Sequence, residues 1–460
     1  MRFYKYAIIL VVVVAILTGI YFIVDRTVEP EEDIVAESIE LLEIDDEEEV
    51  QSLTVKNNEG EFVFERDGNS WNLISGGEFE ADSLRLNNIV SSITELHAER
   101  IIEENTEDFE RYGLLEALVL TVETVDGDSS VLELGSATAT HESYYMRLNA
   151  SDTVYTIPYD VGSVFNVTKT DIRDRYVINC RRADVIEFGL ERDGKTVFMA
   201  EREGERDWNI VDPFEVSGNI VDISDAMDSF IRTHAIEYVE EDASDLSTYG
   251  LDNPRYAVEA KTNEGQSFKL LIGDEKGMNF ETYIKEIYAL LEGSNEVFLI
   301  DIGPLNFLEK SLIDFVNRFV YVEDMRYMEG AYVEIDDEEI NLKIERITDD
   351  EGRERLNYYV NEKEVYEDGH WNFRELYRTL MAVGVKEIDI EAEPPEEQPE
   401  ALMTFYLNKD PEEVTIEFIP RDDTSYYALR NGEYTGLIAE QESFDIISET
   451  YDILLDDLKD

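Results

Sequence analysis

Cysteine, proline and histidine are all scarce in this chain of 460 residues. It has one Cys, 10 Pro and four His, while 43% of its residues are hydrophobic. The single cysteine, Cys180, excludes an intramolecular disulfide and a Cys-based zinc cluster, and we expect it to be a packed residue. It also lies too far from the N-terminus to carry a lipoprotein-type anchor. The apolar content is too high for a disordered chain, and the length predicts two to four domains.

Basic residues are also few. The chain has 39 Lys and Arg against 107 Asp and Glu, a net charge of −68. Such a surface repels phosphate backbones and anionic lipid headgroups, which argues against nucleic-acid binding. Because the acids are spread over the whole length, the favoured interpretation is a salt-adapted solvated surface. Binding of cations or of a basic partner is the alternative.

One long apolar stretch stands near the N-terminus. It begins at Ala7, ends at Val24 and contains no charged residue. Its length matches the hydrocarbon thickness of a bilayer. Arg2 and Lys5 precede it, so the positive-inside rule predicts a cytoplasmic N-terminus and an extracytoplasmic body. A cleaved signal peptide is the alternative, but no small-x-small cleavage pattern follows Val24.

The segment after this anchor is strongly acidic. Twelve acidic residues and no basic one lie between Glu29 and Glu49. Mutual repulsion keeps such a segment extended, so we interpret residues 25–41 as a spacer. A metal-binding tract is the less favoured alternative.

The rest of the chain repeats itself. Four landmarks recur at a nearly constant offset, which is 137 for the first three pairs and 138 for the last: Trp71 with Trp208, His97 with His234, Tyr112-Gly113-Leu114 with Tyr249-Gly250-Leu251, and Gly135 with Gly273. An offset of this kind indicates duplicated modules. We therefore predict an anchor at 1–24, repeat 1 at 42–178 and repeat 2 at 179–325.

A third and more divergent copy is predicted at 326–460. Its stretch from Ser425 to Arg430 resembles that from Ser143 to Arg147, and the helical pattern after Trp371 resembles the one before His97. An acidic, proline-containing loop replaces the Tyr-Gly-Leu turn.

Within the first copy the spacing of hydrophobic residues changes from a strand-like to a helix-like period along the chain. Short β-branched runs separated by turns predict antiparallel strands. Asp82 is then a candidate N-cap for a helix, and Pro158 precedes a short helix that ends at Phe165. The apolar face predicted for the longer helix consists of Leu84, Leu86, Ile89, Val90, Ile93 and Leu96. The expected class is α+β: a transmembrane helix, then two clear repeats and one divergent repeat of a mostly antiparallel sheet with a packed helix.

The repeated residues are better explained by folding than by chemistry. We expect Trp71 and Trp208 to be core anchors rather than ligand-stacking aromatics. His97 and His234 lie near helix ends in different modules, which favours a structural role over a metal pair. Glycine in the Tyr-Gly-Leu turn is typical of a positive φ.

Two tyrosine pairs are the candidate binding residues. Tyr144-Tyr145 and Tyr426-Tyr427 lie on predicted strands, where alternation sends one ring of each pair inward and the other outward. An outward ring could contact a glycan or protein partner, and a surface filler is the favoured alternative.

Active-site patterns are missing. The sequence has no G-x-S-x-G elbow, H-E-x-x-H motif, P-loop or dinucleotide fingerprint, and its Asp-Gly turns lack EF-hand spacing. We therefore predict no catalytic residues, no metal site and no cofactor, and we expect no enzyme.

The order of several motifs resembles a known family. DGNSWNLI, HAERIIEE, DFERYGL, LELG, SYYMRLNASDTVYTIP and DIRDRYVI follow one another as in the bacterial domain of unknown function 4340, DUF4340. The resemblance covers residues 42–178 closely and 183–320 well, and residues 326–460 loosely. It departs at Ala117, where the family often has Pro. It implies an envelope protein with no catalytic residues to carry over.

Members of that family are often associated with ABC-transporter components resembling those of gliding-motility systems. The resemblance therefore implies an extracytoplasmic, membrane-anchored accessory or scaffold protein whose partners are transporter subunits. A module that binds cell-wall glycan or an envelope ligand is the alternative function.

Overall fold

The computed structural model describes residues 39–458, with residues 43, 45, 205, 206, 336, 337, 349–353, 367 and 368 excepted. The predicted anchor from Ala7 to Val24 lies outside the described residues. Among the described residues, no helix is long and apolar enough to cross a membrane. The chain divides into two compact units, one ending at Arg175 and the other beginning at Tyr176. The predicted module boundaries stay predictions.

The first unit is built on an eight-stranded antiparallel sheet in the order β4-β3-β2-β7-β8-β9-β10-β6. Helices α2 (Ser83–Thr94) and α3 (Tyr159–Phe165) both contact this sheet and each other. The strands are β2 (Val50–Asn57), β3 (Gly60–Asp67), β4 (Ser70–Ser75), β6 (Arg100–Glu103), β7 (Leu118–Thr124), β8 (Ser129–Ala137), β9 (Ser143–Leu148) and β10 (Val154–Pro158). A separate two-stranded sheet pairs β1 (Ile39–Glu40) with β5 (His97–Ala98).

The long helix of this unit begins as predicted. The Asp82 side chain accepts a hydrogen bond from the Arg85 backbone amide (2.9 Å) and so caps α2. The prediction for Leu84 is wrong, because its side chain is 73% exposed. Leu84 lies two positions before Leu86, about 200° around the helix, and therefore on the other face. Leu96 is buried although the helix has already ended at Thr94.

The second unit contains two nine-stranded antiparallel sheets. The first has the order β14-β13-β12-β11-β16-β17-β18-β19-β15. Helices α4 (Ile220–Ile231) and α5 (Leu312–Phe315) contact each other and its strands. The strands are β11 (Val185–Arg192), β12 (Lys195–Glu203), β13 (Asp207–Asp212), β14 (Val216–Ser217), β15 (Glu237–Glu240), β16 (Tyr256–Thr262), β17 (Ser267–Asn279), β18 (Ile284–Leu291) and β19 (Val297–Asp301).

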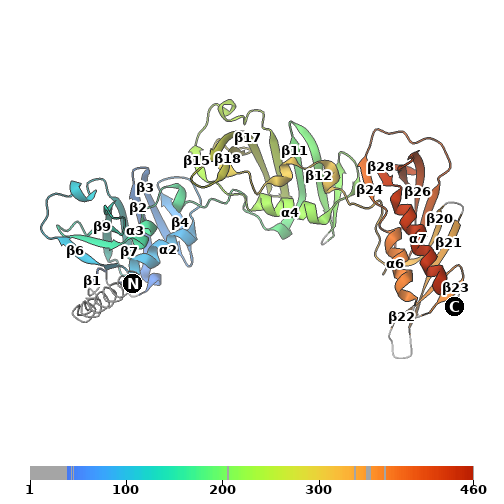
Figure 1. The fold of residues 1–460 in the computed structure, drawn as a ribbon. Coiled ribbons are helices and arrows are strands. Elements are labelled where there is room, and N and C mark those ends of the chain that lie inside the picture. Colours follow the sequence, from blue (N-terminus) through green and yellow to red (C-terminus); the bar gives the residue numbers. More distant parts are fainter. Residues whose placement is uncertain are drawn as a thin grey trace, which may run out of the picture. The chain divides into compact units, whose positions relative to one another are not determined.

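The last sheet has the order β23-β22-β21-β20-β25-β26-β27-β28-β24. Helices α6 (His370–Leu380) and α7 (Glu442–Asp457) pack on each other (Figure 1). The strands are β20 (Met328–Ile335), β21 (Glu338–Thr348), β22 (Glu354–Val360), β23 (Lys363–Val365), β24 (Val385–Ile388), β25 (Ala401–Leu407), β26 (Glu413–Asp422), β27 (Ser425–Arg430) and β28 (Glu433–Glu440).

The three large sheets share one topology. In each, a meander of three or four strands is followed by a helix, then by a strand that crosses to the far edge, then by a second meander. We call the three segments modules 1, 2 and 3. This arrangement of mostly antiparallel sheets with few helices confirms the α+β class in the described residues, and the transmembrane part of that prediction remains untested.

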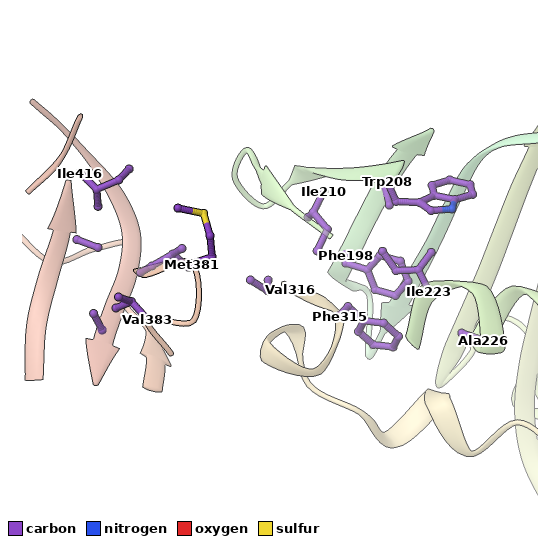
Figure 2. Close-up of a cluster of buried hydrophobic side chains, with 14 of the residues drawn as sticks. Phe198, Trp208, Ile210, Ile223, Ala226, Phe315, Val316, Met381, Val383 and Ile416 are labelled. Carbon is purple, nitrogen blue, oxygen red and sulfur yellow. The ribbon is translucent and has the colours of Figure 1, made fainter. Parts of the chain in front are cut away.

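Tryptophan fills the core of the first two modules. Trp71 and Trp208 are buried, as predicted, and Trp208 belongs to a cluster with Phe198 and Phe315 (Figure 2). The Phe198 and Phe315 ring centroids lie 4.2 Å apart. Phe315 comes from α5, so the segment that leaves module 2 also completes its core.

The segments that follow modules 1 and 2 are themselves repeated. We call residues 168–177 and 311–320 the connectors; they read TKTDIRDRYV and SLIDFVNRFV. In each, a hydroxyl residue and an aspartate three positions later form the same turn, since Thr168 Oγ1 donates to Asp171 Oδ2 and Ser311 Oγ to Asp314 Oδ2. The division between the two compact units falls inside the first connector.

Each connector makes two sets of backbone bonds. Near its middle it pairs with the residues just before the preceding helix: Arg173 bridges to Ala81, and Val316 bridges to Gly218. Its last part pairs with residues after the next helix, where Tyr176 bridges to His234 and Phe319 bridges to Gly384. A connector is therefore a short strand shared by two consecutive modules. In module 1, β1 takes the place of this last part, because Glu40 pairs with His97.

Candidate functional site

The inward members of the two tyrosine pairs are Tyr144 and Tyr426. Tyr144 is buried and stacks on Tyr159 of α3, with ring centroids 5.1 Å apart. Burial, followed by contact with Tyr159, raises the pKa of Tyr144. Tyr426 packs edge-to-face on Phe444 of α7 (4.9 Å). Strand alternation turns these two side chains towards the helices, as predicted for one ring of each pair, so Tyr144 and Tyr426 are not outward-facing aromatics.

The outward members, Tyr145 and Tyr427, are covered by other rings. Tyr145 packs edge-to-face on Tyr112 (4.9 Å), and Tyr427 packs on Tyr434 (5.8 Å) with the Arg421 guanidinium 5.9 Å from its ring centroid. Both side chains are half-buried. Ligand binding by the four tyrosines stays a prediction, although their rings have little free surface.

The Tyr-Gly-Leu segments form a flap on the sheet face opposite the helices. In module 1 the flap buries Tyr112 and Leu114 against Val154, and the Tyr112 hydroxyl donates to Glu103 Oε2 (2.6 Å). This hydrogen bond is the main cause that raises the pKa of Tyr112. Gly113 has a φ of 71°, which confirms the predicted positive value.

Module 2 repeats the flap closely. The Tyr249 hydroxyl donates to Glu240 Oε2 (2.7 Å), its ring packs on Tyr288 (5.0 Å), and Gly250 has a φ of 67°. Tyr288 thus corresponds to Tyr145 of module 1. These residues stabilise a turn, and the predicted folding role of the Tyr-Gly-Leu motif agrees with their packing.

Both repeated histidines lie just after their helices, as predicted. His97 Nδ1 is 2.7 Å from the Glu95 carbonyl oxygen, and His234 Nδ1 is 3.4 Å from that of Arg232. Both side chains are exposed. In the described ranges no group of three or more His, Cys, Asp or Glu side chains is placed to hold a metal ion.

A hollow of about 670 Å³ lies beside His234 in module 2. Tyr176 stacks edge-to-face on His234 at its wall, with ring centroids 6.3 Å apart. Its other lining residues are mostly polar and include Asp225, Asp228 and Asp301. Asp228 is already paired with Arg182 (2.9 Å), so the wall is partly neutralised.

A larger hollow of about 1270 Å³ lies on the outer face of the module 3 sheet. Four of its residues form one row across neighbouring strands: Tyr359, Lys343, Gly330 and Tyr406. Gly330 has no side chain, so the row has a gap between Lys343 and Tyr406, and a Cβ atom at this position would lie 2.4 Å from the Leu342 carbonyl oxygen. The remaining lining residues are mostly glutamate and asparagine, together with Leu342, Ile344 and Arg346.

One repeated arginine was missed by the sequence analysis. Arg66, Arg202 and Arg346 occupy equivalent strands, β3, β12 and β21, and each guanidinium donates to backbone carbonyls of the segment that enters its module. Arg66 and Arg202 also lie over Trp71 and Trp208, with Cζ 5.0 and 4.9 Å from the ring centroids. A search for arginines five or six residues before each tryptophan would have found two of them.

The lone cysteine is not an activated thiol. Cys180 is half-buried against the hydrophobic core of the second unit, as predicted. Burial, reinforced by the nearby Asp184 carboxylate, raises the pKa of the thiol. A raised pKa disfavours the nucleophilic thiolate.

Comparison with models of known protein families shows to which family the chain belongs. The model of the domain of unknown function DUF4340 matches twice, over residues 71–254 and 208–400. The chain belongs to the DUF4340 family. The double match also confirms the internal repeat in this DUF4340 protein.

Other comparisons add little about the DUF4340 chain. No curated protein matches it. A comparison of structures pairs it with the DnaN sliding clamp of Pseudomonas aeruginosa bound to griselimycin, at 9% identity over 85% of this chain and 92% of that chain, with a TM-score of 0.14. That TM-score does not establish a shared fold, and nothing is inferred from the pairing.

Proposed function

We propose that this DUF4340 protein is a non-enzymatic scaffold anchored in the cell membrane, with its body outside the cytoplasm. In this proposal it is an accessory subunit of an ABC transporter of the gliding-motility type. The apolar stretch from Ala7 to Val24 supplies the anchor, and the family resemblance supplies the class of partner.

The observation that supports a scaffold is the repeated connector. Both connectors use the same turn and the same backbone pairing with the modules on either side. A chain of similar modules joined in one way presents several binding surfaces along one polypeptide, as in repeat proteins. Such a series of surfaces suits contact with a multi-subunit partner.

In-cell crosslinking of the full chain tests the partner. The tagged protein is crosslinked with a lysine-reactive reagent, recovered and analysed by mass spectrometry, beside an unrelated single-span membrane protein with the same tag. Permease or ATPase subunits of an ABC transporter should be enriched over this control. If neither subunit is enriched, the accessory role is wrong.

Cysteine labelling of intact cells tests the location. In a Cys180→Ser background, Leu84→Cys places a thiol on an exposed position of α2, and Lys5→Cys places one before the apolar stretch. A membrane-impermeant maleimide should label position 84 in intact cells and position 5 only after permeabilisation. The reverse pattern would place the body in the cytoplasm.

Binding of a cell-wall glycan is the second candidate function, and the hollow of module 3 favours it. Two tyrosine rings at the ends of a row, with Lys343 and Gly330 between them and amide and carboxylate groups around them, suit a polyhydroxylated ligand. The full chain in detergent should sediment with isolated wall material, and Tyr406→Ala should reduce its retention. Tyr366→Ala, an exposed position outside the hollow, is the matched control. Equal retention of both variants would contradict glycan binding at this site.

A further inference from the structure

One hairpin of module 2 is longer than its counterparts. The hairpin β17–β18 can be compared with the others from equivalent cross-strand pairs: Leu134 with Met146 in module 1, Ile272 with Ala289 in module 2, and Phe418 with Ala428 in module 3. The two members of the pair are 12, 17 and 10 positions apart. Module 2 therefore carries five more residues here than module 1 and seven more than module 3.

The added residues account for a change in the repeat itself. Gly135 and Gly273 are 138 positions apart, whereas the connectors that follow are 143 apart. The difference of five equals the extra length of the hairpin. The length change between the first two modules after these glycines is therefore concentrated in this one element.

The tip of this hairpin exposes large apolar side chains. Phe280 is 80% and Tyr283 is 82% exposed, and Met278 beside them is 48% exposed. Single exposed apolar residues need no explanation, but three at the end of one projecting turn form a patch. Aromatic side chains on such a turn are the usual anchors of a protein interface.

The tip is held in a defined conformation. Asn279 Oδ1 accepts hydrogen bonds from the backbone amides of Glu281 (3.0 Å) and Thr282 (3.3 Å). Asn279 Nδ2 donates to Glu286 Oε1 (2.8 Å), and this bond is the main cause that lowers the pKa of Glu286. Preorganisation of this kind reduces the entropy lost on binding.

Ion pairs brace the stem below the tip. Lys285 Nζ lies 2.6 Å from Glu275 on the opposite strand. Lys276 Nζ lies 3.2 Å from Glu286 and 3.4 Å from Glu237 of the edge strand β15. Both lysines of residues 274–286 are thus paired with acids, and this segment keeps a net negative charge of two.

The charge selects the kind of partner. A second copy of this chain would bring another net charge of −68 against the hairpin, and an anionic membrane surface would also repel it. A protein with an apolar pocket surrounded by Lys or Arg satisfies both the aromatic tip and the acidic stem. We propose that the β17–β18 hairpin is a docking element that inserts Phe280 and Tyr283 into a basic-rimmed apolar pocket of a partner protein.

This inference goes beyond the proposed function, because the partner need not be a transporter subunit. Modules 1 and 3 have the same strands without the extended tip, so docking is assigned to module 2. A failure of the hairpin to dock would leave transporter association elsewhere on the chain intact.

Photo-crosslinking in cells tests the docking element. A benzophenone amino acid replaces Phe280 in the full membrane-anchored chain, and the same amino acid at Tyr366, an exposed aromatic position of module 3, is the control. Position 280 should crosslink to a protein, and the crosslinked peptide of that protein should contain apolar residues flanked by Lys or Arg. Tyr283→Ser in the same chain should reduce the yield about tenfold or more, since buried aromatic anchors carry much of an interface's affinity.

A charge variant separates the two parts of the proposal. Glu281→Lys leaves the apolar tip in place and should lower the yield and weaken its dependence on salt. Crosslinks only to lipid, only to a second copy, or no more than at position 366 would overturn the proposal. A yield unaffected by Tyr283→Ser would also overturn it. Unchanged thermal unfolding of the variants verifies that the fold is intact.

Discussion

The close contact between Gly273 and the Tyr-Gly-Leu turn of module 2 gives a sharp prediction. A Cβ atom at position 273 would lie 2.2 Å from the Tyr249 carbonyl oxygen and 2.9 Å from the Gly250 carbonyl carbon. Both neighbours are backbone atoms, so no side-chain rotation can relieve the clash. In Gly273→Ala the turn must therefore move off the sheet.

The size of the effect follows from the cost of overpacking, about 1–3 kcal/mol. Every 1.4 kcal/mol corresponds to about a factor of ten, so amides of the turn should exchange about 5- to 150-fold faster. The Leu251 amide, which donates to the Leu246 carbonyl (3.0 Å), is the reporter. Hydrogen exchange of the full chain in detergent, read by mass spectrometry over residues 246–251, measures it.

Two further variants make the experiment decisive. Gly135→Ala in module 1 would place its Cβ 2.3 Å from the Tyr112 carbonyl oxygen and should loosen residues 109–114 in the same way. Gly303→Ala is the control, because the nearest atom, 3.1 Å away, belongs to the Asp301 side chain, which can rotate. Exchange in Gly273→Ala no faster than in Gly303→Ala would refute the reasoning.

Three other outcomes are expected. Trp208→Ala should destabilise the protein by about 3–5 kcal/mol, because the side chain is only 2% exposed. Trp371→Ala, at a side chain that is 65% exposed, should change the stability by less than about 0.5 kcal/mol. Thermal unfolding of the two variants makes the comparison. Burial, followed by the hydrogen bond to Glu309, raises the pKa of Tyr256 to about 12. The neutral form of Tyr256 therefore contributes its full stabilisation below a pH of about 10, and this contribution is lost as the pH rises from there towards 12. Tyr256→Phe should therefore flatten the fall in Tm over that window, and an unchanged slope would contradict the assignment. Because the net charge is −68, Tm should rise as NaCl is raised from 0.1 to about 1 M, since the Debye length falls from about 10 to 3 Å and screens the self-repulsion. A falling Tm would show that self-repulsion is not dominant.

The sequence predicted the module well where local chemistry decides the structure. The cap at Asp82, the positive φ of Gly113 and Gly250, and the burial of Trp71 and Trp208 each depend on one residue type in a short motif. Module 3 was harder, because it has no Tyr-Gly-Leu turn and its exposed Trp371 lies on a helix rather than in the core.

The candidate sites could be predicted much less well. Strand alternation gives the side of the sheet to which Tyr145 and Tyr427 belong, but not the rings of Tyr112 and Tyr434 that cover them. The contact between Tyr112 and Tyr145 joins residues that are distant along the chain, and the contact between Tyr427 and Tyr434 depends on how the strand bends. The hairpin tip at Phe280 had a signal in the sequence, namely the change of the repeat offset from 138 to 143, and only the exposed fractions of its side chains gave that change a meaning.

The shared connector also bears on how such a chain can change its length during evolution. The first connector begins at Thr168 and the second at Ser311, so the segment 168–310, from one start to the next, forms a cassette with matching ends. Duplication of that cassette in the gene would insert a whole module and recreate the same junction on both of its sides. Relatives should therefore differ in size by whole modules more readily than by parts of one, and a chimaera with an additional cassette should fold without redesign of its junctions.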